Sequence, residues 1–193
     1  MTMTMTMTNS FRPSRRQLLR YSAGISLAGT SVSFAPRAFA GHTQASELAF
    51  DHTHTHEKIS LIYAMDGQYM PTALDRLNHF LRDHYTGTVG TMDPSLFDIL
   101  HRILLTLDAR QPFQVISGYR SAATNGRLRK TGGGGVAKRS LHMDGKAIDI
   151  RLPGVPLAEL RDAALSLKAG GVGFYPRDRF IHVDTGRVRH WGA

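Results

Sequence analysis

Residues 140–150 read SLHMDGKAIDI and residues 180–184 read FIHVD, and each stretch predicts a strand with polar side chains on one face. In both, isoleucine or valine alternates with a histidine or an aspartate. Because successive side chains of a strand point to opposite faces, burial of the aliphatic residues turns Asp149 away from the core. The same rule places His182 and Asp184 together on the outer face of the second strand.

Three of these polar residues have the chemistry of a metal site. Gly145 lets the chain turn between His142 and Asp149, so a ligand before the turn can meet one after it. The imidazoles of His142 and His182, with the Asp149 carboxylate, supply three ligands of a tetrahedral zinc ion and leave the fourth position for water. Such an ion lowers the pKa of its water and polarises a carbonyl, which suits amide hydrolysis. The spacing alone leaves structural roles for the same residues equally open.

The wider pattern predicts an α+β fold in which helices flank a small, antiparallel sheet. Apolar residues recur at three and four positions over 71–83 and 94–107, which predicts two amphipathic helices, the second N-capped by Asp93. A third helix is expected around 157–168. Strands are expected at 59–63, 113–116, 147–152 and 180–184, with a turn at 117–121 and a flexible glycine loop at 131–135.

Composition excludes several classes of protein. The chain has 193 residues, 41% of them hydrophobic, and no cysteine, which excludes a disulfide scaffold, a thiol nucleophile and a Cys-ligated zinc site. Its formal charge is +9, but five basic residues and no acidic residue lie in the first forty positions. The remaining 19 basic and 15 acidic residues leave +4 on one domain of about 150 residues. We therefore expect no nucleic-acid binding.

The N-terminus predicts export. Residues 15–20 read RRQLLR, residues 21–35 are weakly apolar, and residues 38–40 read AFA, which together indicate a twin-arginine signal cleaved after Ala40. The alternative, an uncleaved anchor, is disfavoured because the apolar run is short and polar for a membrane span. The twin-arginine translocase is then a partner, and the mature chain works in the periplasm.

Residues 41–56 are polar and rich in histidine, and the domain that carries the candidate zinc site is predicted over 57–193. We interpret His52 and His56 as solvated residues of an edge or linker. The alternative is an adventitious metal-binding tract.

Six short sequence motifs also occur one after another along the chain and are characteristic as a set. They are SGYRS at 117–121, Asn125, SLHMDGKAIDI at 140–150, GVGFYP at 171–176, FIHVDTG at 180–186 and RHW at 189–191. The set resembles the YcbK-like murein endopeptidases of the zinc peptidase superfamily that joins D-Ala-D-Ala peptidases with hedgehog domains. The resemblance runs from about Thr53 to Trp191. It implies a hedgehog/D,D-peptidase-like fold and a Zn²⁺ enzyme acting on peptidoglycan peptides, with His142, Asp149 and His182 as ligands.

The resemblance assigns further residues beside the metal. It implies that Arg120, after Ser-Gly-Tyr, binds substrate or stabilises a developing oxyanion, and a guanidinium fork suits either role. The alternative is an arginine paired with a structural acid. Tyr119 is interpreted as a substrate contact, with a place in the wall or core as the alternative.

One position departs from the superfamily pattern. Many members carry a glutamate base three residues before the last histidine, where this chain has Arg179. Asp184 is the local candidate for the catalytic base, and the equal alternative is that it orients an imidazole. His190 is a weaker candidate, and His54 resembles a histidine of the family without an assigned role.

These observations predict an exported, monomeric zinc metallopeptidase that hydrolyses amide bonds in peptidoglycan stems or cross-links. Which bond is cut, D,D or L,D, does not follow from the residues. The alternative is a catalytically silent, zinc-containing module that binds the cell wall, and Arg179 at the usual base position favours it.

Overall fold

The computed structural model describes residues 44–131 and 136–192. The predicted export signal, its cleavage site after Ala40 and residues 132–135 of the glycine loop lie outside these residues.

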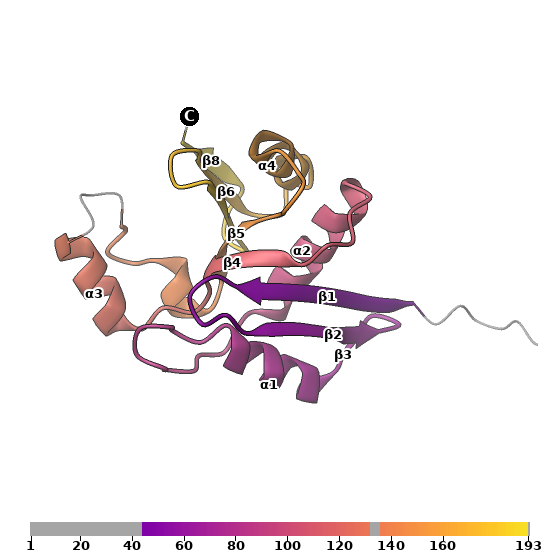
Figure 1. The fold of residues 1–193 in the computed structure, drawn as a ribbon, viewed down its shortest axis with the longest axis horizontal. Helices are drawn as coiled ribbons and strands as arrows, with labels where there is room; N and C mark the ends of the chain where they lie inside the picture. Colours follow the sequence, from indigo (N-terminus) through magenta and orange to yellow (C-terminus); the bar gives the residue numbers. More distant parts are fainter. Residues whose placement is uncertain (1–43, 132–135, 193) are drawn as a thin grey trace, which may run out of the picture. The chain divides into compact units, whose positions relative to one another are not determined.

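Eight strands and four α-helices make up the described part of the chain (Figure 1). The strands are β1 (Ala45–His52), β2 (Lys58–Met65), β3 (Gln68–Tyr69), β4 (Phe113–Ser117), β5 (Ala147–Arg151), β6 (Gly171–Tyr175), β7 (Phe180–Asp184) and β8 (Arg189–Trp191). The helices are α1 (Pro71–Phe80), α2 (Pro94–Thr106), α3 (Ala122–Thr131) and α4 (Leu157–Ser166), with a short 3-10 helix η1 (Leu141–Asp144).

All eight strands belong to one sheet, in the order β3-β2-β1-β4-β5-β7-β6-β8. The pairs β1–β4 and β6–β8 are parallel, and the other neighbours are antiparallel. The predicted α+β class is confirmed. The sheet is larger than predicted and mixed, because β1, β3, β6 and β8 were not expected as strands. β6 is rich in glycine and β3 and β8 are very short, so their extended form depends on pairing with neighbours rather than on local sequence.

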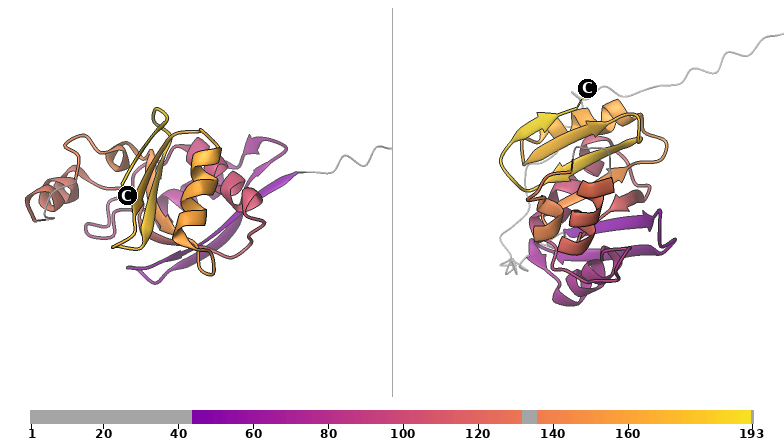
Figure 2. Two further views of the ribbon diagram at one scale, coloured as in Figure 1. Left: turned by 90° about the horizontal axis from the view of Figure 1, so that it is seen from above. Right: turned by 90° about the vertical axis from the view of Figure 1, so that its left-hand side faces the viewer.

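The hydrophobic core lies between one face of the sheet and the helices. Helix α1 contacts β2, α2 contacts β1, and α4 contacts β6 and β7. Figure 2 shows α4 lying along the sheet. Ile148, Ile150, Ile181 and Val183 are buried in this core, as predicted. By alternation the opposite face of β5 and β7 is left for polar side chains.

Helix α2 agrees closely with its prediction. Its apolar stripe is buried, and the Asp93 carboxylate caps its N-terminus by accepting a hydrogen bond from the Ser95 amide at 3.0 Å. Each fully buried leucine of the stripe contributes about 1.5–3 kcal/mol of hydrophobic stabilisation. Helix α1 ends at Phe80, before the expected Asp83, because the Asp83 carboxylate instead accepts hydrogen bonds from the Tyr85 and Ser121 amides at 2.9 Å.

Helix α3 was not predicted, and Figures 1 and 2 show it projecting away from the sheet. It lacks an apolar stripe, and only Thr124 and Asn125 are buried in it. Without that stripe the helical period gives no signal in the sequence.

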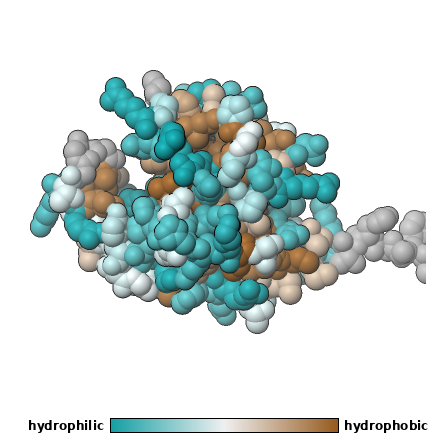
Figure 3. Space-filling model, in the orientation of Figure 1, coloured by the Kyte–Doolittle hydropathy of each residue, from teal (hydrophilic) through white to brown (hydrophobic). Residues whose placement is uncertain are grey.

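Within residues 44–131 and 136–192, no helix has the length and hydropathy to cross a membrane. The face in Figure 3 is largely hydrophilic with scattered apolar areas. Exposed apolar surface of this kind is ordinary for a folded domain.

Candidate metal centre

The three predicted ligands meet on the outer face of the sheet. His142 Nε2 lies 3.2 Å from His182 Nδ1 and 3.3 Å from Asp149 Oδ1, and His182 Nδ1 lies 2.9 Å from the same oxygen. All three side chains are buried. Among the described residues this is the one group of three or more His, Cys, Asp or Glu side chains with the spacing to hold a metal ion.

Two local features bring these side chains together. Asp149 and His182 are direct partners in the antiparallel β5–β7 register. His142 lies in η1, and Gly145 ends that helix with φ of 67°, a conformation that favours glycine. A Cβ at this position would also collide with the Thr91 carbonyl. The predicted turn at Gly145 is therefore confirmed.

The SGYR block holds His142 in one tautomer. His142 Nδ1 lies 2.7 Å from the Gly118 carbonyl oxygen, which can only accept, so the hydrogen is on Nδ1 and Nε2 offers its lone pair. The Arg120 amide also donates to the His142 carbonyl at 3.1 Å. Burial lowers the pKa of His142, which keeps its ring neutral.

His182 is held between two carboxylates. Its Nε2 lies 3.0 Å from Asp184 Oδ2, on the side of the ring opposite the Nδ1 that approaches Asp149. Burial lowers the pKa of His182, but hydrogen bonds to Asp149 and Asp184 outweigh that effect and raise it to about 9 in the metal-free protein. Burial raises the pKa of Asp149, but His142 and His182 together hold it well below its usual range.

The spacing of the three donor atoms fits zinc. In a tetrahedral site with bonds of 2.0–2.1 Å, two ligand atoms are about 3.3 Å apart. The three observed separations, 2.9–3.3 Å, are close to that value. The donor set of two imidazole nitrogens and one carboxylate oxygen is also one that catalytic zinc sites use.

Arg120 lies beside this group. Its Nη2 is 3.2 Å from Ser117 Oγ and 3.5 Å from Asp149 Oδ2, and its side chain is 12% exposed. The guanidinium thus contacts the carboxylate of the metal group and also lines the cavity over it. Arg120 therefore lines the site, as predicted, and also pairs with an acidic residue, as the alternative held.

Tyr119 and His54 do not line that cavity within the described part of the chain. Tyr119 packs against the core, and its ring lies where a side chain at Gly90 would be. This position agrees with the alternative reading of Tyr119 as wall or core. His54 stacks on the His84 ring at 4.2 Å with an interplanar angle of 6°.

The interpretation of His52 as a solvated residue is wrong. His52 is 2% exposed and belongs to β1, where its Nδ1 accepts from the His54 and Thr55 amides at 3.1 and 3.3 Å. The alternation of Leu48, Phe50 and His52, all buried, could have revealed this strand. His56 is exposed, with a φ of 59° in the turn between β1 and β2.

Asp184 is fully buried and accepts five N–H groups. Oδ1 accepts from the Gly171 amide at 3.0 Å, the Gly186 amide at 2.8 Å and Arg189 Nη1 at 2.9 Å. Oδ2 accepts from Arg189 Nη2 at 2.6 Å and lies 3.0 Å from His182 Nε2. Burial raises the pKa of Asp184, but the His182 and Arg189 contacts hold it well below its usual range.

The weaker base candidate, His190, and Arg179, which stands where many members have the glutamate base, lie in exposed positions. Arg179 has a φ of 57° in the turn between β6 and β7, and His190 is exposed on β8. Neither is among the described residues that line the cavity.

A cavity of about 420 Å³ opens over the metal group. Besides the ligands, its wall carries three arginines, an aspartate and three aromatic residues: Arg120, Arg139, Arg189, Asp178, Tyr175, Phe180 and Trp191. The sequence motifs contained Tyr175, Arg189 and Trp191 but assigned them no function. Their proximity to the metal group depends on β6 and β8 pairing beside β7, which no local pattern predicted.

Similarity to known proteins identifies the class to which this protein belongs. A family model described as "Peptidoglycan L,D-endopeptidase MepK" matches residues 40–191, and the chain belongs to this peptidase family. The resemblance to the YcbK-like murein endopeptidases is thereby confirmed.

Individual relatives are similar over most of the chain. The peptidoglycan L,D-endopeptidase MepK of Escherichia coli (strain K12) is 40% identical over 183 residues, which is 95% of this chain and all of that protein. The MepK of Shigella flexneri matches to the same extent. The probable peptidoglycan L,D-endopeptidase MepK of Haemophilus influenzae is 45% identical over 145 residues, 75% of this chain and 77% of its own length. No solved structure matches the chain significantly.

Proposed function

We propose that this protein is a zinc-dependent endopeptidase that hydrolyses the L,D amide bond in peptidoglycan peptides. The observation that carries the proposal is the triangle of His142, Asp149 and His182 donor atoms beneath a cavity that Arg120 lines. Membership of the peptidase family and the printed activity of the relatives support the substrate and the L,D bond.

A zinc ion in this site would be held by His142 Nε2, His182 Nδ1 and Asp149. When bound, it supplies an activated water and polarises the scissile carbonyl. The Gly118 carbonyl and the Asp184 carboxylate orient the two imidazoles, because each fixes the hydrogen on the ring nitrogen that faces away from the metal.

Arg120 supplies positive charge where the oxyanion develops. Its guanidinium is buried enough for its charge to act through little water, and it lies beside the Asp149 ligand. Arg139 lines the same cavity and adds a second positive charge, which suits an anionic peptide.

The contacts of Asp184 favour the orienting role over the base. Both of its oxygens are occupied by N–H donors, and its lowered pKa makes it a weak proton acceptor. Asp178 is the one carboxylate besides Asp149 among the described residues of the cavity wall. It is therefore the position to test next as the base.

We also propose export through the twin-arginine pathway to the periplasm, with cleavage after Ala40. The motif RRQLLR at 15–20 supports this route. Replacing Arg15 and Arg16 by lysine should leave the precursor in the cytoplasm, as cell fractionation would show. Normal periplasmic accumulation of that variant would contradict the proposal.

The decisive experiment for the activity is digestion of purified muropeptides with the zinc-loaded protein, followed by mass spectrometry. We expect products of L,D cleavage, no cleavage after chelation, and recovery when zinc is added back. Products of D,D cleavage would refute the bond assignment. Binding to peptidoglycan without any product would support the silent wall-binding module instead.

A further inference from the structure

The C-terminal strand β8 lies two strands away from the ligand His182, yet its side chains reach it. Strand β8 pairs with β6 so that Arg189 is opposite Gly171 and Trp191 is opposite Gly173. On its other side β6 pairs with β7, where Gly171 is opposite Asp184 and Gly173 is opposite His182. Two straight rows thus cross the sheet, Asp184–Gly171–Arg189 and His182–Gly173–Trp191.

Glycine at the middle of each row leaves space for the side chain that comes from β8. A Cβ at Gly171 would collide with the Arg189 guanidinium and come within 2.5 Å of Asp184 Oδ2, and a Cβ at Gly173 would lie 2.7 Å from the Trp191 ring. Without those Cβ atoms, the β8 side chains pass over β6 and contact the β7 side chains. Because β6 has the sequence GVG, the side chains of β8 can reach across it to the metal group.

In the first row, Arg189 donates two parallel hydrogen bonds to Asp184, from Nη1 to Oδ1 at 2.9 Å and from Nη2 to Oδ2 at 2.6 Å. This bidentate geometry fixes the plane of the carboxylate as well as its charge. Oδ2, the oxygen that receives Nη2, is also the one that lies 3.0 Å from His182 Nε2.

In the second row, the Trp191 ring lies against the His182 imidazole, with centroids 5.2 Å apart. Its indole N–H donates to the Tyr175 hydroxyl at 2.8 Å. Packing against Trp191 restricts rotation of the His182 ring, and the contact with Asp184 fixes the ring through its Nε2.

From this arrangement we infer that Arg189 is a positioning residue that acts through Asp184 to hold His182 with Nδ1 toward the metal. The inference rests on the proposed function, because His182 is a ligand only if the site holds zinc. Loss of the fork leaves Asp184 with the two backbone amides on Oδ1 and with His182 as the single partner of Oδ2, so the carboxylate can turn and release the Nε2 hydrogen. The imidazole then loses its fixed tautomer and binds metal less well.

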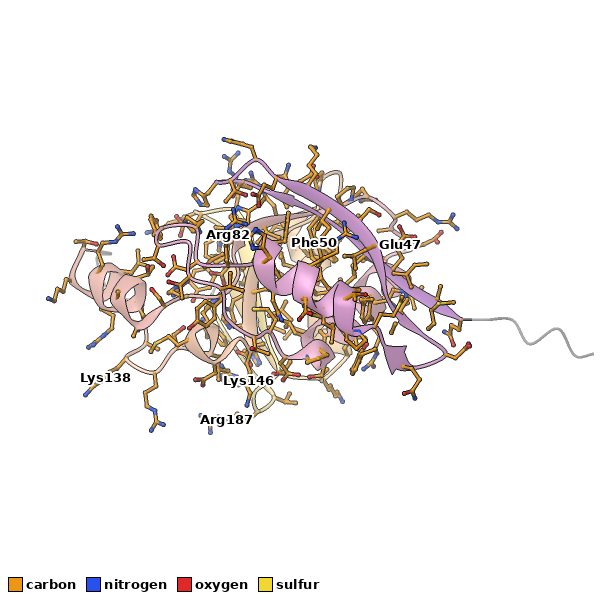
Figure 4. All side chains as sticks on the ribbon, turned by 90° about the horizontal axis from the view of Figure 1, so that it is seen from below. Glu47, Phe50, Arg82, Lys138, Lys146 and Arg187 are labelled. Carbon is orange, nitrogen blue, oxygen red and sulfur yellow. The ribbon has the colours of Figure 1, made fainter. Side chains whose placement is uncertain are left out.

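Zinc affinity, measured by competition with a chelator in the absence of substrate, tests the inference. Arg189→Met should bind zinc about 10-fold to 100-fold more weakly than the wild type. Arg189→Lys should fall between them, because one ammonium cannot replace a planar fork. Arg187→Met is the matched control: it removes the same charge two residues away, from an arginine at the outer surface of the domain (Figure 4), and should bind zinc normally.

A double-mutant cycle tests whether Arg189 acts through Asp184. In the Asp184→Asn background, Arg189→Met should weaken zinc binding by less than about 2-fold, because the group that transmits its effect is gone. Long-range ¹H–¹⁵N spectra of the zinc-loaded protein provide a second readout. They should place the His182 proton on Nε2 in the wild type and show a loss of that single state in Arg189→Met.

Several outcomes would overturn the inference. Unchanged zinc affinity and His182 spectrum in a folded Arg189→Met protein would reduce Arg189 to a stabilising ion pair. A rise in KM alone, with normal zinc binding, would make it a substrate contact on the cavity wall. If Arg189→Met does not fold, unchanged affinity in Arg189→Lys has the same meaning. Zinc binding and spectra involve no substrate, so a wrong assignment of the cleaved bond leaves this test intact.

Discussion

Two groups of histidines, one at the metal group and one around the buried His52, differ in their carboxylate partners. His142 and His182 share Asp149, and His182 also contacts Asp184. His52 and His84 pack edge to face at 5.6 Å beside His54, and their Nε2 atoms have no hydrogen-bond partner among the described residues.

The pKa values follow this difference. Burial and the positive charge of neighbouring histidines together lower the pKa of both His52 and His84 to about 4, and Glu57 and Asp83 offset only part of this effect. The pKa of His182 instead rises to about 9 because two carboxylates outweigh its burial. Buried imidazoles alone therefore form neutral packing, and a shared carboxylate turns a similar pair into a candidate metal group.

The largest expected difference between the two groups is in metal content. Alanine at His142, Asp149 or His182 should each remove most of the bound zinc and reduce activity to background, since each takes one of three ligands. His54→Ala should retain zinc, because the three ligand atoms do not include it. Metal analysis of purified variants measures both, and full occupancy in the first three would refute the site.

Arg120 tests whether charge beside the metal group acts separately from metal binding. Arg120→Ala should keep its zinc and fold but lose on the order of 10²-fold or more in kcat, the effect of removing one stabiliser of the transition state. Arg120→Lys should recover little of it. Arg127→Ala is the control, because Arg127 lies over the Tyr85 ring instead. Wild-type turnover in Arg120→Ala would leave only the structural pairing with Asp149.

Asp184 and Asp178 separate orientation of a ligand from proton transfer. If Asp184 orients His182, Asp184→Asn should weaken zinc affinity by about 10-fold to 100-fold, and excess zinc should restore most of the rate. If Asp178 is the base, Asp178→Asn should keep its zinc and lose roughly 10²-fold in turnover, with a changed acidic limb of the pH–rate profile. A loss in Asp184→Asn that excess zinc does not restore would return the base to Asp184.

The smallest expected effect is on acid stability through His52. The folded-state pKa of His52 and His84, about 4, lies below the ordinary value of 6.5, so the unfolded chain binds more protons as the pH falls. The contribution of these two histidines to stability should be constant above about pH 7 and fall between 6.5 and 4, by on the order of 1–3 kcal/mol. Urea unfolding at several pH values measures it.

A variant pair isolates this contribution. His52→Asn removes the titration but keeps an acceptor for the two amides that His52 Nδ1 binds, so its stability should fall less between pH 6.5 and 4. His56→Asn changes an exposed histidine of the same turn and should behave like the wild type. Identical pH dependence in His52→Asn and the wild type would show that another group causes the loss.

Local pattern was sufficient for the elements whose side chains repeat with a clear period. Residues close together in the sequence determine the apolar stripe of α2 and its Asp93 cap. They also determine the alternation in β5 and β7. The same alternation placed Asp149, His182 and Asp184 on the outer face, and the expected turn at Gly145 brought His142 to them. These inferences need only the geometry of one strand or helix, which neighbouring residues determine by themselves.

Strand pairing decided the rest, because it joins residues that are distant in sequence. Only the β5–β7 register shows that Asp149 and His182 are neighbours, and only the β8–β6–β7 rows bring Arg189 to Asp184. The burial of His52 likewise follows from β1 pairing between β2 and β4. Composition and charge around residues 45–52 indicate a polar segment, whereas the sheet supplies the partners that bury three of its eight side chains. The sequence by itself thus determined which groups carry the chemistry, and the tertiary structure determined which of them meet.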